Sequence, residues 1–85
     1  MEFEFSKHSL DQLEHRGISK EMILSIILQP DFVVDQDKAI RIYSKFVDTD
    51  SKIYLYRVFV NYLKNPSLII TAYKTSKIEK YGYKI

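Results

Sequence analysis

The feature that most constrains the fold is a change of sequence pattern at Pro30. Before it, apolar residues recur at the three- and four-residue spacing of amphipathic helices. After it, β-branched and aromatic residues dominate, as in the run KIYLYRVFVNYL of residues 52–63. Proline does not continue a helix, because it lacks a backbone N–H and its ring clashes with the preceding turn. The pattern therefore predicts a helical N-terminal part followed by strands.

Two serines and a glycine mark the ends of the predicted helices. Ser6 and Ser19 suit the N-cap position, since a serine hydroxyl accepts from the first free N–H groups of a helix. Gly17 suits the left-handed position that ends a helix. Together these signals predict helices over about residues 7–16 and 20–29.

Five segments have the composition of β-strands and are bounded by turn residues. They cover residues 2–6, 31–37, 39–46, 52–63 and 68–76, and residues 77–85 form a tail. The predicted fold class is α+β, with two N-terminal helices packed on one face of an antiparallel β-sheet (β-α-α-β-β-β) and the later strands joined as a meander. The pattern leaves open which face of the sheet the helices cover.

The composition fits a single small domain over residues 1–85. Hydrophobic residues make up 46% of the 85, enough for one core. The lack of cysteine excludes disulfides, thiolate zinc sites and cysteine nucleophiles, and it fits a reducing cytoplasm. No apolar run approaches the roughly 18 residues of a membrane span, and the N-terminus lacks a signal-peptide pattern. We therefore expect a cytoplasmic protein that does not contact membranes.

Charge is distributed unevenly along the chain. Residues 1–37 hold eight acidic and three basic residues, whereas residues 38–85 hold three acidic and ten basic ones. A basic second half with many tyrosines indicates an anionic partner such as nucleic acid, because cations meet phosphates and aromatic rings stack on bases. The alternative is that the charges serve solubility and the tyrosines are ordinary strand residues.

Both histidines of the chain lie in the first predicted helix. His8 and His15 are separated by about 10.5 Å of helical rise, at 1.5 Å per residue, so they do not share one metal ion directly. Asp11 could pair with His15, but no HExxH pattern accompanies it. The two glycines do not form a phosphate-binding loop, and no GxSxG motif is present. We expect neither a metal nor a cofactor.

Cleavage of RNA without a metal is a chemistry that these residue types could perform. It requires a base for the 2′-hydroxyl, an acid for the leaving 5′-oxygen, and cations for the crowded phosphorane. His8 is the candidate for proton transfer, and Arg16, Arg41, Arg57 and Lys74 are candidate phosphate ligands. The alternative is a capping or structural role for His8. His15, at the far end of the helix, is interpreted as a dipole partner or a surface residue.

Two long motifs carry a resemblance to a known family. They are FSKHSLDQLEHRGISKEMILSIILQPDFVV, residues 5–34, and LIITAYKTSKIEKY, residues 68–81. Together they resemble the small prokaryotic toxins of the RelE/ParE superfamily, in particular BrnT-like proteins. The chain departs from that pattern at Gln12 and Leu13, where many such proteins carry an arginine. The resemblance implies a RelE-like fold and a metal-independent ribonuclease that inhibits growth.

The resemblance also implies partners and site residues. The partners would be an antitoxin from an adjacent gene and RNA, with mRNA on the ribosome as one form of it. His8 and Arg16 match the early histidine and arginine of the family, and Tyr73, Lys74 and Thr75 fall in the closing motif, as does Thr71. With the basic sheet residues added, the assigned set is His8, Arg16 and Arg57 for catalysis and Arg41, Lys45, Tyr73, Lys74 and Thr75 for RNA binding. The alternatives are a noncatalytic RNA- or protein-binding module and an inactive toxin-like protein.

Overall fold

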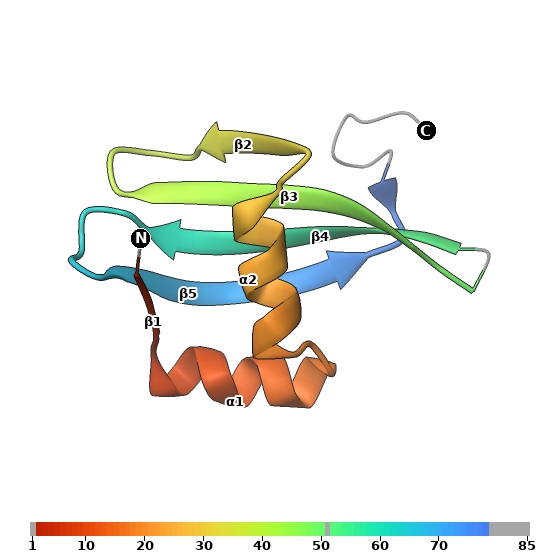
Figure 1. Cartoon of the computed structure of the whole chain (residues 1–85), viewed down its shortest axis with the longest axis horizontal. Helices are drawn as coiled ribbons and strands as arrows, with labels where there is room; N and C mark the ends of the chain where they lie inside the picture. The colour runs from red at the N-terminus through yellow and green to blue at the C-terminus, as the bar shows by residue number, and fades with distance from the viewer. Residues whose placement is uncertain (1, 51, 79–85) are drawn as a thin grey trace.

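The secondary structure follows the order β-α-α-β-β-β-β (Figure 1). A computed structural model describes residues 2–50 and 52–78. The elements are β1 (Phe3–Phe5), α1 (Lys7–Arg16), α2 (Lys20–Leu28), β2 (Phe32–Asp35), β3 (Ile40–Thr49), β4 (Lys52–Asn61) and β5 (Ser67–Thr75). The α+β class is confirmed. The order contains one strand more than β-α-α-β-β-β, and each of the five segments predicted as strands, including residues 31–37, contains an observed strand. The predicted tail lies, from residue 79 onward, outside the described residues.

The described strands form one sheet in the order β1-β5-β4-β3-β2. The pairs β2–β3, β3–β4 and β4–β5 are antiparallel, as the predicted meander requires. β1 instead pairs in parallel with residues 67–69 of β5. The expectation of a purely antiparallel sheet is therefore wrong, and the sheet is mixed. The two helices between β1 and β2 carry the chain across the sheet, so the first strand meets the last one.

Both helices begin at the predicted N-cap residues, and α1 ends at the predicted Gly17. The Ser6 hydroxyl accepts from the N–H of Ser9 at 3.0 Å, and the Ser19 hydroxyl accepts from the N–H of Met22 at 3.1 Å. Gly17 has a φ of 69° and ends α1 in the left-handed conformation. α2 ends one residue before the predicted limit, at Leu28. A residue that precedes proline is pushed out of the helical region, which explains the earlier end.

Replacing Gly17 by alanine is expected to lower the free energy of unfolding by about 1–2 kcal/mol. No described atom lies within 4 Å of the place where a Cβ would stand, so the cost arises from the backbone conformation and not from a clash. Urea denaturation measures it. Gly17→Asn is the matched control, because asparagine tolerates the left-handed region better, and its loss should be smaller. Equal losses for the two variants would contradict this account.

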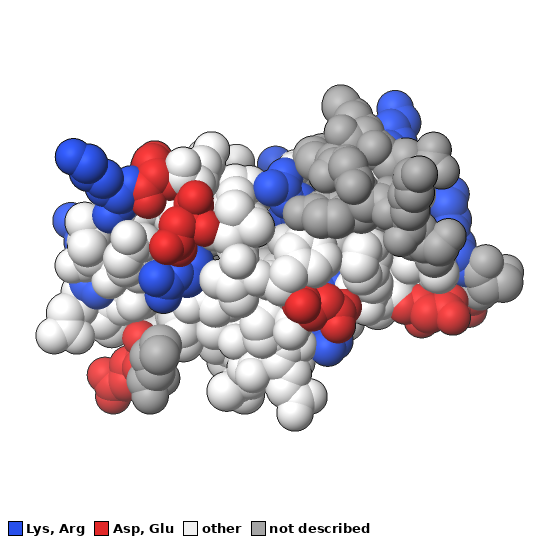
Figure 2. All heavy atoms as spheres, turned by 90° about the horizontal axis from the view of Figure 1, so that it is seen from above, with Lys and Arg blue, Asp and Glu red and all other residues white. Residues whose placement is uncertain are grey.

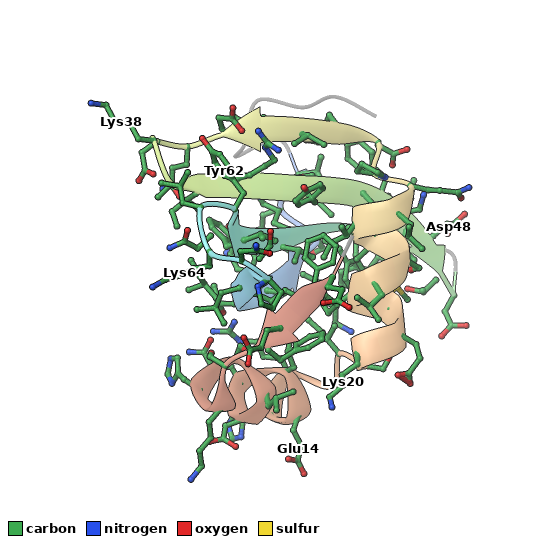
Figure 3. The ribbon with its side chains drawn as sticks, turned by 60° about the vertical axis from the view of Figure 1, so that its left-hand side comes forward. Glu14, Lys20, Lys38, Asp48, Tyr62 and Lys64 are labelled. Atoms are coloured by element: carbon green, nitrogen blue, oxygen red, sulfur yellow. The ribbon has the colours of Figure 1, made fainter. Side chains whose placement is uncertain are left out.

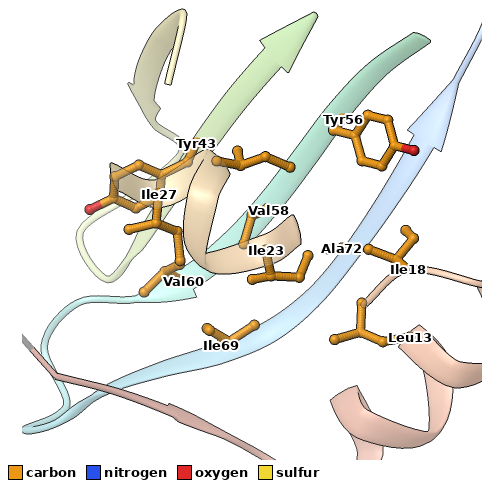
Figure 4. Close-up of a cluster of buried hydrophobic side chains, with 11 residues drawn as sticks. Leu13, Ile18, Ile23, Ile27, Tyr43, Tyr56, Val58, Val60, Ile69 and Ala72 are labelled. Atoms are coloured by element: carbon orange, nitrogen blue, oxygen red, sulfur yellow. The ribbon is translucent and has the colours of Figure 1, made fainter. Parts of the chain in front are cut away.

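One hydrophobic core lies between the helices and one face of the sheet (Figure 4). Ile23 and Ile26 of α2 and Val58 and Val60 of β4 are completely buried. Both helices contribute to the same cluster, whose other buried members are Leu13, Ile18, Ile27, Tyr43, Tyr56, Ile69 and Ala72. α2 crosses β3 and β4, while α1 lies along β5 (Figure 1). Burial of this apolar surface is the main force that holds the helices to the sheet.

The strand register shows which side chains share a face of the sheet. Residues directly opposite each other point to the same side, and Tyr43 lies opposite Val58, which belongs to the core. We call this side the helix face and the other side the reverse face. Leu55, opposite Phe46, is on the reverse face, and it is completely buried there. The reverse face is therefore partly covered as well.

No helix in residues 2–50 and 52–78 is long and apolar enough to cross a membrane.

Candidate functional site

The outer surface of α1 contains a shallow hollow of about 350 Å³. It is lined by His8, Asp11, Gln12, His15 and Arg16. Each of these residues is three or four positions away from another of them, so they occupy one side of the helix. The side chains of His8 and Arg16, two of the three predicted catalytic residues, are exposed in this hollow. His15, which was interpreted as a dipole partner, lines the same hollow.

Arg16 links α1 to the edge of β5. Its Nη1 donates to the carbonyl oxygen of Ala72 at 2.7 Å and to Oγ1 of Thr71 at 3.1 Å. The Thr71 hydroxyl in turn donates to Oε1 of Gln12. β1 pairs with β5 only as far as Ile69, and α1 covers the edge beyond that point. Arg16 therefore satisfies a strand-edge carbonyl that would otherwise need water or another partner.

Arg57, the third predicted catalytic residue, lies on the reverse face among aromatic rings. Its Nη1 donates to the hydroxyl of Tyr73 at 2.8 Å. Its guanidinium carbon lies 5.4 Å from the ring centre of Phe59 and 5.9 Å from that of Tyr73. The two rings meet edge to face at 5.9 Å. The hydrogen bond to Tyr73 and the cation–π contacts with Phe59 and Tyr73 help to hold the half-buried guanidinium.

Thr71 connects the hollow to this cluster. It lies directly opposite Phe59 in the β4–β5 register, so both side chains point to the reverse face. Its hydroxyl contacts Arg16 and Gln12 at the same time. The hollow and the cluster therefore form one surface, which we call the α1–β5 surface. Its members are His8, Asp11, Gln12, His15, Arg16, Arg57, Phe59, Thr71 and Tyr73.

Two of the predicted RNA-binding cations, Arg41 and Lys45, lie on the helix face and hold local structure. Nε of Arg41 donates to Oδ1 of Asp35 at 2.8 Å, and this hydrogen bond raises the pKa of Arg41. The same guanidinium lies 4.3 Å from the ring centre of Tyr62, at the end of β4 (Figure 3). Nζ of Lys45 donates to the carbonyl oxygen of Gln29 at 2.7 Å, just after α2. A cation stabilises that end of a helix.

The other predicted RNA-binding residues are divided between the two faces. Lys74 is exposed on the helix face, with its Nζ 5.3 Å from the ring centre of Tyr54 and 6.0 Å from that of Tyr56. Thr75 is opposite Leu55 on the reverse face, and its Oγ1 accepts from the N–H of Lys77. Only Tyr73 of the predicted RNA-binding set belongs to the α1–β5 surface. The structure thus groups His8, Arg16, Arg57 and Tyr73 and separates the remaining cations from them.

Five residues of the surface were not assigned to the predicted site. His15 was interpreted as a dipole partner or a surface residue, and Thr71 was noted only as part of the closing motif. The other three are Asp11, Gln12 and Phe59. Gln12 is four residues from both His8 and Arg16, so helical spacing alone could have identified it. Asp11 was considered only as a metal ligand. Phe59 could not be found from the sequence, because only the strand register places it beside Thr71. In the described part of the chain, no three His, Cys, Asp or Glu side chains gather as ligands for a metal ion.

Comparison with known proteins gives one match. A family model described as "Domain of unknown function (DUF4258)" matches residues 5–74. That range includes both helices and every residue of the α1–β5 surface. No match was found among curated proteins or among solved structures. Because the family model covers most of the 85 residues, the chain belongs to the family of domains of unknown function DUF4258.

Proposed function

We propose that this protein is a toxin-type, metal-independent endoribonuclease with a RelE-like fold, and that the α1–β5 surface is its active site. The observation that carries the proposal is the shared hollow of His8 and Arg16, joined through Thr71 to the pair formed by Arg57 and Tyr73. Proton-transfer groups and cations on one exposed surface are what RNA cleavage requires. The resemblance of both terminal motifs to BrnT-like toxins supports the same activity.

The two histidines divide the proton transfers between them. His8 takes the proton of the 2′-hydroxyl, whose oxygen then attacks the adjacent phosphorus. The bond from phosphorus to the 5′-oxygen breaks, and His15 gives that oxygen a proton. The products are a 2′,3′-cyclic phosphate and a 5′-hydroxyl end. This assignment revises the interpretation of His15, because both histidines line one hollow.

The other members of the α1–β5 surface bind the RNA. Both contacts of Arg16 use Nη1, and its Nη2 and Nε make none with the described residues, so they can donate to the phosphorane. The rings of Phe59 and Tyr73 offer a sequence-tolerant platform for a base, as aromatic residues do in single-strand binding. The partner in the cell is an antitoxin from an adjacent gene, and the site of action is the cytoplasm, where mRNA is found.

Incubation of the purified protein with a single-stranded RNA tests the proposal. Cleavage is expected in the presence of EDTA, and mass spectrometry should find 2′,3′-cyclic phosphate ends. Induction of the gene should arrest growth, and co-expression of the adjacent gene should restore it. A reaction that stops when EDTA is added would contradict the metal-independent mechanism. Cleavage that leaves 5′-phosphate ends would contradict the roles given to the histidines.

A noncatalytic RNA-binding module is the second candidate, and one observation favours it. Arg16 is already bonded to Ala72 and Thr71, so it serves the β5 edge whether or not RNA is present. Such a module would bind RNA with an affinity that falls steeply as salt rises, because binding to phosphates releases counterions. It would form no product at any protein concentration. Filter binding and gel analysis of the same samples separate the two candidates.

A further inference from the structure

β2 forms one edge of the described sheet. It is last in the strand order, and among residues 2–50 and 52–78 it pairs only with β3. The N–H of Gln36 donates to the carbonyl oxygen of Ile40, so the even-numbered residues of β2 direct their backbone groups to β3. Before β2, the N–H of Asp31 also donates to β3, at the carbonyl oxygen of Ser44. Antiparallel strands alternate, and the N–H and C=O groups of Val33 and Asp35 therefore point away from β3. They can bond to an added strand.

The side chains along this edge are apolar in the middle. Val33 and Val34 are 44% and 46% exposed, on opposite faces of the strand. Leu28, at the end of α2 and four residues before β2, is 80% exposed. α2 packs on β3, the strand next to β2. A strand added at this edge would therefore lie beside an exposed valine on each face of the sheet.

Carboxylates stand on either side of the apolar middle. Asp31, Asp35 and Asp37 are all exposed, and residues 31–37 contain no lysine or arginine. Figure 2, which looks at the molecule from the side of β2, shows red patches separated by white areas, with blue patches beside several of them. Arg41 pairs with Asp35, and no other salt bridge with these aspartates occurs in the described residues. The edge therefore favours a partner that carries positive charge.

The same aspartates disfavour a second copy of the chain. In an antiparallel pair of two β2 strands, the backbone groups of Val33 and Asp35 would form the hydrogen bonds between the copies. Three registers allow this: Val33 opposite Val33, Val33 opposite Asp35, and Asp35 opposite Asp35. Continued beyond the ends of β2, the first two registers place Asp31 opposite Asp35 and Asp31 opposite Asp37. The third places Asp35 opposite Asp35. Like charges directly opposite each other destabilise a strand pair. Each register thus meets repulsion at a two-fold interface.

We propose that the β2 edge binds an extended, basic segment of another protein, which adds a sixth strand to the sheet. Backbone bonds to Val33 and Asp35 would supply affinity, and side chains would supply specificity, as in other cases of strand addition. Three consecutive apolar residues of the partner would meet the valines. A lysine or arginine on each side of them would meet Asp31 and Asp35. This surface is distinct from the α1–β5 surface, so its occupation does not depend on ribonuclease activity.

A synthetic peptide tests the proposal on the full chain. The probe carries the core Lys-Ile-Val-Ile-Lys between short polar flanks, and isothermal titration calorimetry measures its Kd. The Val33→Pro variant should bind it about tenfold more weakly, because proline removes an outward N–H without touching the bonds to β3. The Asp35→Asn variant leaves the backbone unchanged, and its Kd should depend less on salt than that of the wild type.

Two controls keep the test specific. Leu63→Ser removes a side chain that is 66% exposed and lies outside this edge, and it should leave the Kd unchanged. A peptide with glutamate in place of each lysine should bind about tenfold more weakly. Equal binding of the two peptides would overturn the proposal, and so would an unchanged Kd in both Val33→Pro and Asp35→Asn. A wild-type chain that dimerises while Val33→Pro is monomeric would assign the edge to a second copy instead.

Discussion

Replacing His8 by alanine is expected to lower the rate of RNA cleavage by roughly 100- to 10,000-fold, the usual contribution of a general acid or base. The side chain is exposed in the hollow on α1, so its loss should change the free energy of unfolding by no more than about 0.5 kcal/mol. Single-turnover assays with a labelled RNA measure the rate. Denaturation of the same preparation confirms that the variant is folded.

The matched control for His8→Ala is Glu14→Ala. Glu14 is also exposed on α1, but it points away from the sheet and does not line the hollow (Figure 3). Its replacement should leave cleavage unchanged. His15→Ala should reduce the rate as well. If His8→Ala cleaves as fast as Glu14→Ala, the proton transfer belongs to another residue.

His8 gives a cleaner test of catalysis than Arg16 does, for a structural reason. The bonds from Arg16 to Ala72 and Thr71 hold α1 against the open part of the β5 edge. An alanine at this position would remove a cation from the hollow and leave a strand-edge carbonyl without its partner. Lost activity in that variant would therefore have two explanations. His8 lines the hollow without such a bond to β5 among the described residues.

Helix limits that are set by residues close together in the sequence were predictable. Ser6, Ser19 and Gly17 act within one helical turn, so the limits of α1 and the start of α2 follow from chemistry that the sequence displays. The pairing of β1 with β5 joins segments more than sixty residues apart, and no local pattern encodes its parallel direction. The prediction therefore succeeded for the elements and for the class but failed for this strand pair.

The face of each β5 residue was not predictable either, because β5 has an irregular register. Thr71 lies opposite Phe59, but the next pair joins Val60 to Ile69. The alternation of side chains between the two faces of β5 therefore breaks at Ile70, and both Ile69 and Ala72 point into the core. The same irregularity decides which side chains of the closing motif reach the reverse face. Tyr73 reaches Arg57, whereas Lys74 faces the opposite side.

The candidate site was predictable only where a helix carries it. The spacing of His8, Asp11, His15 and Arg16 places them on one side of α1, and the structure has them in one hollow. Arg57 needed the pairing of β4 with β5 to come near them. The prediction from basic composition placed Arg57 in the same set of RNA-contacting residues as Arg41, Lys45 and Lys74, which lie on the helix face. The excess of lysine and arginine in the second half of the chain therefore indicated an anionic partner, whereas the fold is needed to see which cations lie close together.

Replacing Ile26 by alanine is expected to lower the free energy of unfolding by about 2–5 kcal/mol. Ile26 is completely buried between α2 and the sheet, so the change removes apolar contacts and leaves a cavity that neighbours fill only in part. Domains of this size have a total stability of roughly 4–13 kcal/mol, from about 0.05–0.15 kcal/mol per residue. The variant should therefore unfold at a much lower urea concentration, and part of it should be unfolded without denaturant if the total is at the low end.

Leu28→Ala is the matched control for this prediction, because it makes a similar change on the same helix at a side chain that is 80% exposed. Its free energy of unfolding should stay within about 0.5 kcal/mol of the wild type. Helix propensity favours alanine at both positions, so the difference between the two variants isolates burial. Similar losses in the two would mean that α2 does not pack with Ile26 inward. The helix face and the reverse face, and with them the position of Arg57, would then have to be reassigned.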